Sequence, residues 1–124
     1  MKKEAISWFN QAEKDLKKAE ILFKNLQYDG ATFYSQQAAE KSLKALCISK
    51  GLGLIKTHDL SLLGKKLELP LTLLEKAILL NPFYTSSRYP LVAEEQDVSN
   101  KENAKLSINY AKEILKWCKE KIRT

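Results

Sequence analysis

The sequence contains few of the residues from which catalytic centres are usually built. Its 124 residues include one histidine, two cysteines and one methionine. Zinc sites need several histidine or cysteine ligands at fixed spacing, and no such set is present. The single histidine gives little support for a Ser-His-Asp centre, and no glycine-rich loop is present to cradle phosphate groups. We therefore expect no metal and no cofactor, and the commonest catalytic constellations are excluded.

Glycine and proline are also scarce, at four and three residues. Few turn-forming residues indicate long helices joined by short connections. The hydrophobic content of 44% and the charged content of 29% are typical of a soluble globular protein. A chain of this length can bury a core of its own. We therefore predict one all-α domain over residues 1–124.

Long apolar runs are missing as well. No run approaches the roughly 18 residues that span a bilayer, and the first residues lack the apolar core of a signal sequence. We expect a cytoplasmic protein that does not enter the membrane. In that reducing compartment, Cys47 and Cys118 are interpreted as buried core residues rather than as a disulfide or redox pair.

The stretch from Gly30 to Lys50 is predicted to be the central helix. Small or apolar side chains surround most of its circumference, which indicates a helix packed on several sides. The remaining stripe, about 100° wide, is polar. It consists of Gln37, Glu40, Lys41 and Lys44. We interpret this stripe as either a solvent-filled slot or a binding site.

Hydrophobic periodicity predicts three further long helices and one short helix, which together form an up-and-down bundle. The long helices run from about Lys3 to Gln27, from Leu71 to Leu80, and from a capping box at Ser99–Glu102 to Arg123. The short helix follows an N-cap at Thr57 or Asp59 and ends near Leu67. A further helical turn is possible from Phe83 to Tyr89.

Three local details follow from the same pattern. Tyr28–Gly30 is expected to be a short turn that makes the first two helices antiparallel. The leucines of residues 71–80 are dense enough that this helix is expected to be largely buried. In the first helix, Asp15 and the neighbouring lysines are assigned mainly to the face opposite the core.

The polar residues of the central helix allow two interpretations. Glu40 and Lys44 are four residues apart in the orientation that favours an ion pair on an exposed helix face. On a helix that is packed around most of its circumference, however, the same charges face a crevice or a second subunit and have to be paired or used. The sole histidine, His58, is either a structural residue bonded to backbone or cap groups or a general acid-base group.

Arg88 and Tyr89 are candidates for contact with a polyanion. Basic residues outnumber acidic ones by 21 to 15, and the net charge is +6, which favours polyanions although it is also typical of solvated lysine-rich helices. A guanidinium group forms paired hydrogen bonds with phosphate, and an aromatic ring stacks on bases. The alternative role of Arg88 is a salt bridge that closes one end of the bundle, with Glu94 or Glu95 as neighbours.

Four short motifs together resemble the HEPN family, a helical nucleotide-binding domain of higher eukaryotes and prokaryotes. They are Gln36–Ala45, His58–Leu60, Asn81–Tyr84 and Arg88–Pro90, in that order. Each motif alone is weak, but their order and spacing extend over nearly the whole chain. The first helix, with Trp8 and Asp15-Leu16, is also similar to that of the family.

The resemblance implies a homodimeric bundle, like the substrate-binding subunits of nucleotidyltransferases. It also implies a partner, a small nucleotidyltransferase from a neighbouring gene, in a toxin-antitoxin or nucleotide-handling pair. Many family members are metal-independent ribonucleases that carry an arginine followed, after four to six residues, by a histidine. Counted from Arg88, that histidine would fall at positions occupied by Ala93, Glu94 or Glu95.

We therefore predict a non-nucleolytic HEPN module of the Arg-Tyr-Pro type that binds nucleotide or RNA phosphate. The expected ligand-binding residues are Gln37, Lys41, Lys44, Arg88 and Tyr89. One alternative is a metal-independent ribonuclease in which His58 acts with Arg88. Another is a non-catalytic interaction bundle in which Glu40 and His58 have interface or structural roles.

Overall fold

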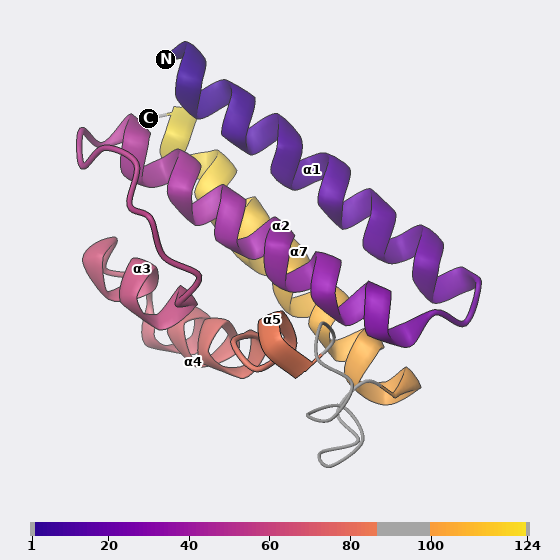
Figure 1. Cartoon of the computed structure of the whole chain (residues 1–124). Helices are drawn as coiled ribbons and strands as arrows, with labels where there is room; N and C mark the ends of the chain where they lie inside the picture. Colours follow the sequence, from indigo (N-terminus) through magenta and orange to yellow (C-terminus); the bar gives the residue numbers. More distant parts are fainter. Residues whose placement is uncertain (1, 87–99, 124) are drawn as a thin grey trace.

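Three long helices lie side by side (Figure 1), and they supply most of the buried apolar residues. They are α1 (Lys3–Lys24), α2 (Tyr28–Ser49) and α7 (Lys101–Arg123). In this computed structural model, which describes residues 2–86 and 100–123, α2 packs extensively on both α1 and α7. The start of α1 and the end of α7 lie at the same end of the bundle.

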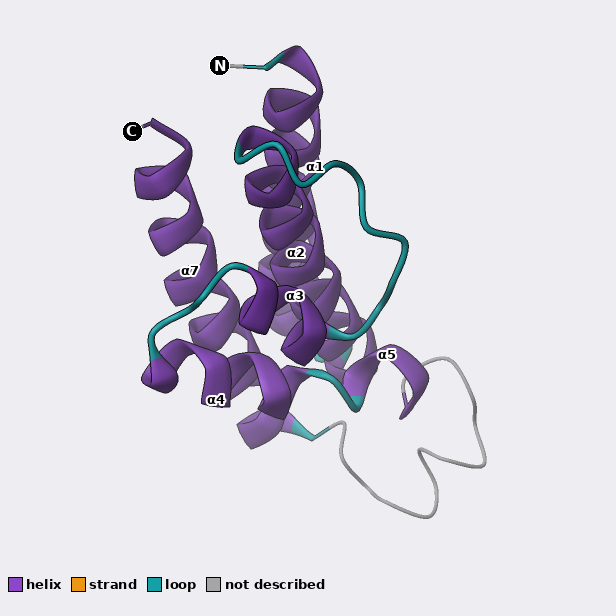
Figure 2. Cartoon of the chain, turned by 90° about the vertical axis from the view of Figure 1, so that its left-hand side faces the viewer, coloured by secondary structure: helices purple, strands orange, loops and turns teal. Residues whose placement is uncertain are grey.

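Three shorter helices lie against one side of this layer, next to α2 and α7 (Figure 2). They are α3 (Leu60–Lys66), α4 (Leu71–Leu80) and α5 (Phe83–Ser86). The described residues contain no strand, so the predicted all-α bundle is confirmed. The bounds predicted for residues 71–80 also agree with α4.

The connection between α1 and α2 comes earlier in the sequence than predicted. Tyr28–Gly30 is not a turn, because α2 already begins at Tyr28. The chain instead reverses at Asn25–Gln27, where Leu26 adopts a left-handed backbone conformation with φ 62°. Gly30 therefore lies inside α2, and a Cβ there would be 2.9 Å from Cδ1 of Leu22 on α1. The glycine serves the close packing of the two helices rather than a turn.

The prediction that the second long helix is central is confirmed. Side chains on nearly all of its circumference are buried, including polar ones such as Gln36 and Glu40. The helix ends in a Schellman motif, in which Gly51 N donates to Ile48 O and Leu52 N donates to Cys47 O. Gly51 has φ 81°, a conformation that side-chain-bearing residues rarely adopt.

The prediction that residues 71–80 are largely buried is wrong. Only Ala77 and Leu80 of α4 are buried, whereas Leu71, Ile78 and Leu79 are 69%, 45% and 55% exposed. Among residues 2–86 and 100–123, α4 packs on α3, α7 and α2, and these helices leave Leu71, Ile78 and Leu79 uncovered. The density of leucines shows how apolar a helix is, but not how much of its surface is covered by other helices.

The last helix follows the predicted apolar stripe, and all six of its residues are buried. They are Ala104, Ile108, Ala111, Leu115, Cys118 and Ile122. The cap lies one residue later than predicted, because the side chain of Asn100 accepts a hydrogen bond from the backbone N–H of Asn103 at 2.8 Å. Ser99 lies outside the described residues.

Cys47 and Cys118 are free and buried, as predicted. Burial raises the pKa of both thiols, that of Cys118 to about 12. Over residues 2–86 and 100–123, no helix has the length and apolar character that crossing a membrane requires.

Candidate functional site

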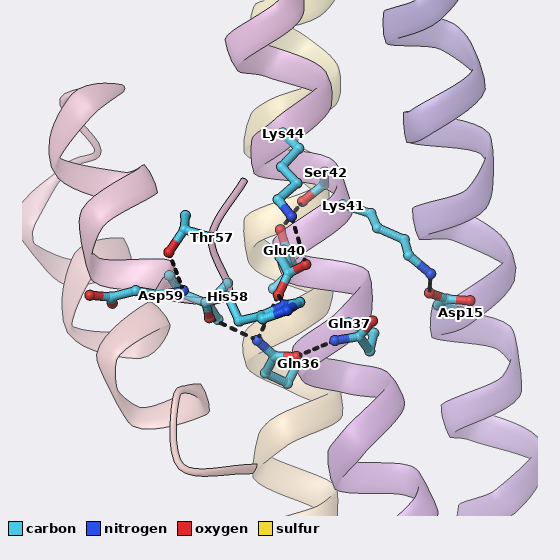
Figure 3. Close-up of polar contacts among 12 residues, drawn as sticks. Asp15, Gln36, Gln37, Glu40, Lys41, Ser42, Lys44, Thr57, His58 and Asp59 are labelled. Atoms are coloured by element: carbon cyan, nitrogen blue, oxygen red, sulfur yellow. Dashed lines mark hydrogen bonds and ion pairs between the residues drawn. The ribbon is translucent and has the colours of Figure 1, made fainter. Parts of the chain in front are cut away.

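The carboxylate of Glu40 is the centre of a polar cluster on α2 (Figure 3). Its Oε2 lies 3.0 Å from Nζ of Lys44, and the two side chains are only 4% and 8% exposed. Its Oε1 lies 3.0 Å from Nδ1 of His58 and 3.3 Å from Nε2 of Gln36. The ion pair expected from the four-residue spacing is present, but it is almost buried rather than exposed on a solvated face.

His58 is held by contacts from three parts of the fold. Its imidazole pairs with Glu40 on α2, and its ring stacks on Tyr84 of α5 with centroids 4.0 Å apart. Its backbone carbonyl accepts a hydrogen bond from Gln36 Nε2 at 3.3 Å. The imidazole is nevertheless 53% exposed. A carboxylate that fixes one ring nitrogen while half of the ring faces solvent fits both a structural role and a role in proton transfer.

The segment after His58 is fixed by the N-cap of α3. The Asp59 side chain accepts hydrogen bonds from the backbone N–H of Ser61 and from Asn81 Nδ2, both at 2.9 Å. Asn81 Oδ1 in turn accepts from the backbone N–H of Leu60 at 2.8 Å. Hydrogen bonds from Ser61 and Asn81 lower the pKa of Asp59 below its usual value. Of the two predicted caps, Asp59 is the one used, and it ties α3 to the end of α4.

The other predicted lysine of the stripe belongs to a second cluster, between α2 and α1. Lys41 Nζ binds Oδ2 of Asp15, a side chain that is 1% exposed. Gln11 Nε2 donates to Oδ1 of Asp15 at 3.0 Å, and Lys18 Nζ lies 3.9 Å from the same atom. Figure 3 shows Lys41 reaching towards α1 while Lys44 turns towards Glu40. The stripe is therefore divided between two buried carboxylates.

Asp15 corrects the assignment of α1. It was expected on the solvent face but is buried among the core positions of that helix. The signal is its spacing, since Asp15 is three residues after Ala12 and four before Ala19, both fully buried. Gln37, half-buried, donates to Gln36 Oε1 at 2.7 Å and so joins the Glu40 cluster.

Two hollows border the stripe. The first, here called the His58 hollow, has a volume of about 310 Å³ and is lined by Trp8, Lys44, Leu54, Lys56, Thr57 and His58. The second, called the Gln11 hollow, has a volume of about 300 Å³ and is lined by Ser7, Trp8, Gln11 and Lys41. Trp8 borders both, and Lys44 Nζ lies 5.7 Å from the centroid of its ring. Sequence reasoning had not identified Trp8 or Lys56 as lining a site.

Arg88 and Tyr89, the other two predicted ligand-binding residues, lie outside the described residues. The structure brings together Gln37, Glu40, Lys44 and His58, and places Lys41 in the adjacent cluster. Within the described part of the chain, no group of three or more histidine, cysteine, aspartate or glutamate side chains could hold a metal ion.

Comparison with known proteins identifies the family. The model of the HEPN domain matches residues 5–121, so the chain belongs to the HEPN family. Its fold is similar to that of an archaeal HEPN homologue, ST0689, with 36% identity, a TM-score of 0.83 and coverage of 98% of this chain and 99% of the other. It is also similar to TT1696 from Thermus thermophilus, with 28% identity, a TM-score of 0.87 and coverage of 97% and 99%. A search of curated proteins found no match.

Proposed function

We propose that this HEPN protein, one domain over residues 1–124, binds the phosphate groups of a nucleotide or of RNA in the His58 hollow. The observation that carries the proposal is the set of side chains lining that hollow. Lys44 and Lys56 supply ammonium groups, His58 supplies a half-exposed imidazole and Trp8 an aromatic ring. Cationic donors bind phosphate, and an aromatic ring beside them stacks on a base.

The local charge supports this proposal. Two lysines line the hollow, and the nearby carboxylate of Glu40 neutralises one of them. The second lysine, Lys56, is exposed and belongs to the loop between α2 and α3. The charge of Lys56 therefore remains unpaired in the lining of the hollow and attracts an anion.

The remaining predicted ligand residues are retained in the proposal. Gln37 belongs to the Glu40 cluster, and Lys41 pairs with Asp15 and lines the neighbouring Gln11 hollow. Arg88 and Tyr89 follow Tyr84, the residue that stacks on His58, by four and five positions in the sequence. We include them as ligand-binding residues contributed by the segment after α5.

A titration tests the proposal. Binding of ATP, GTP and a short single-stranded RNA is measured by calorimetry on the wild type, on Lys56→Ala and on Lys14→Ala. Both lysines are exposed, so the two variants lose the same charge, but Lys14 lies outside the hollow. We expect Lys56→Ala to weaken binding roughly tenfold, the cost of about one charge-assisted contact, and Lys14→Ala to bind like the wild type. Equal binding by all three proteins, or no binding by any, would overturn the proposal.

We also propose that the chain forms a homodimer and acts with a small nucleotidyltransferase encoded by a neighbouring gene. The family resemblance motivates both partners, and the exposed apolar side chains of α4 offer a surface for one of them. Sedimentation of the protein alone and with the product of the adjacent gene tests both parts. A monomer that does not bind that product contradicts them.

A second candidate function, metal-independent RNA cleavage, is favoured by one contact. Nδ1 of His58 faces the carboxylate of Glu40 at 3.0 Å, which is how a general base is commonly oriented. In that reaction the 2′-hydroxyl attacks the adjacent phosphate, and the 5′-oxygen leaves with a proton. This second function predicts cleavage in the presence of EDTA by the wild type and none by His58→Gln. The absence of cleavage by the wild type excludes this function.

A further inference from the structure

Trp8 on α1 is the one residue that lines both the His58 hollow and the Gln11 hollow in the described part of the chain. The two hollows have similar volumes, about 310 Å³ and 300 Å³. Each contains a lysine from α2, and these two, Lys41 and Lys44, are three residues apart. Residues at that spacing are neighbours on one side of a helix, so the hollows follow one another along the same stripe.

The two hollows also repeat the same electrostatic arrangement. In each, a buried carboxylate pairs with a lysine of α2: Glu40 with Lys44, and Asp15 with Lys41. In each, a second lysine stands nearby. In the His58 hollow it is Lys56, which belongs to the lining. At the second carboxylate it is Lys18, whose Nζ lies 3.9 Å from Asp15, outside the lining of the Gln11 hollow. Each carboxylate is therefore associated with two lysines, and each group of three carries a net positive charge.

From this repetition we infer that Trp8 separates two phosphate subsites for one single-stranded oligonucleotide of two or more nucleotides. The inference rests on the proposed function and extends it, because it names the ligand as a strand rather than a mononucleotide. The indole stacks on a base, and the flanking phosphates lie in the two hollows. Single-strand-binding proteins use this combination of a cationic track and an aromatic platform.

The Gln11 hollow has donors available for such a phosphate. An ammonium group has three N–H donors and an amide group two, while Lys41 and Gln11 each use one on Asp15. Ser7 is exposed and adds a hydroxyl group at the rim. These donors belong to α1 and α2, which pack extensively on each other.

The first experiment is a length series. The chain has two tryptophans, so in a Trp117→Phe background the fluorescence reports Trp8 alone. AMP, the dinucleotide pApA and the tetranucleotide pApApApA are titrated at several salt concentrations. We expect pApA to bind roughly tenfold more tightly than AMP and to quench Trp8, because a stacked base and a second phosphate are added. In a plot of the logarithm of the binding constant against the logarithm of the salt concentration, the slope should become steeper by about 0.7 for the added phosphate.

The second experiment blocks one hollow. Ser7→Glu places a carboxylate at the Gln11 hollow, and Asn10→Glu places the same charge on an exposed position of α1 that lines neither hollow. We expect Ser7→Glu to remove the advantage of pApA over AMP and Asn10→Glu to retain that advantage. Both variants change exposed helix positions, and thermal unfolding is measured to check that they are folded.

The outcomes separate this inference from the function on which it rests. If AMP and pApA bind equally, or if Ser7→Glu and Asn10→Glu weaken pApA equally, the two-subsite inference is overturned and phosphate binding in the His58 hollow stands. If none of the three ligands binds the wild type, the proposed function fails and the inference fails with it.

Discussion

Nδ1 of His58 lies 3.0 Å from Oε1 of Glu40, although 18 residues separate them in the sequence. The contact joins the loop before α3 to the central helix and makes Glu40 a shared partner, since its other oxygen pairs with Lys44. One nearly buried carboxylate therefore positions both the imidazole and the ammonium group of the His58 hollow. The stability of the fold and the geometry of the candidate site depend on the same residue.

Glu40→Met is expected to destabilise the protein by about 3 kcal/mol, because it leaves the ammonium group of Lys44 buried without its partner. Lys44→Met is expected to cost a similar amount by leaving the Glu40 carboxylate buried. In the double variant Glu40→Met with Lys44→Met, neither charge remains, so much of the loss is expected to be recovered. Urea unfolding of the four proteins measures the coupling. Additive losses in the double variant would show that the pair is not coupled.

Lys41→Ala is expected to cost about 2–3 kcal/mol, because the Asp15 carboxylate, 1% exposed, would lose its closest cation. The matched control is Lys119→Ala. Lys119 pairs with Glu13 across α7 and α1, but both side chains are nearly half exposed, so its loss is expected to stay within about 0.5 kcal/mol. Thermal or urea unfolding compares the two, and equal effects would contradict the account of Asp15 as a buried anchor.

Asp59→Ala is expected to destabilise the protein by about 1 kcal/mol at neutral pH, the usual value of an N-cap. Hydrogen bonds to the charged form lower the pKa of Asp59 in the folded protein. The stabilisation by this carboxylate is therefore fully present above the pKa of the unfolded chain, 3.8. It is lost as the pH falls through the lower, folded value. The difference between wild type and variant should therefore shrink on acidification below about pH 4. A difference that is unchanged at low pH would exclude the carboxylate as its source.

Cys118→Ala is expected to change the alkaline part of the stability profile. Burial raises the pKa of this thiol from 9.0 to about 12, so between these values the unfolded chain loses a proton that the folded chain keeps. The unfolding free energy of the wild type must then fall with pH, by up to about 1.4 kcal/mol per pH unit from this group. We expect a shallower fall in Cys118→Ala, measured by urea unfolding from about pH 9 to 11. Parallel profiles would contradict the assignment.

The sequence predicted the elements better than their surroundings. Periodicity located α4 correctly because Pro70 and Asn81-Pro82 delimit it, but it could not show that the described helices packed against α4 leave part of its surface exposed. The sequence predicts a turn at Gly30, since glycine is common both in turns and at close contacts between helices. Only the residues that pack against Gly30, such as Leu22, distinguish a turn from a close contact between helices.

Only part of the candidate site could be predicted, because the sequence does not show which helices pack against one another. The polar stripe on α2 follows from helical spacing alone, and its division between Asp15 and Glu40 does not. Lys56 and Trp8 reach the stripe through tertiary packing, and nothing in their local sequence indicates it. Arg88 and Tyr89 remain predictions.

The most direct test of ligand binding in the His58 hollow is an NMR titration of the wild-type protein with ATP. The two indole N–H signals and the signals of the single imidazole can be followed individually. Binding in this hollow predicts that the signals of Trp8 and His58 shift together and saturate, while the indole signal of Trp117 on α7 stays in place. Saturable binding that leaves Trp8 and His58 unshifted would contradict it.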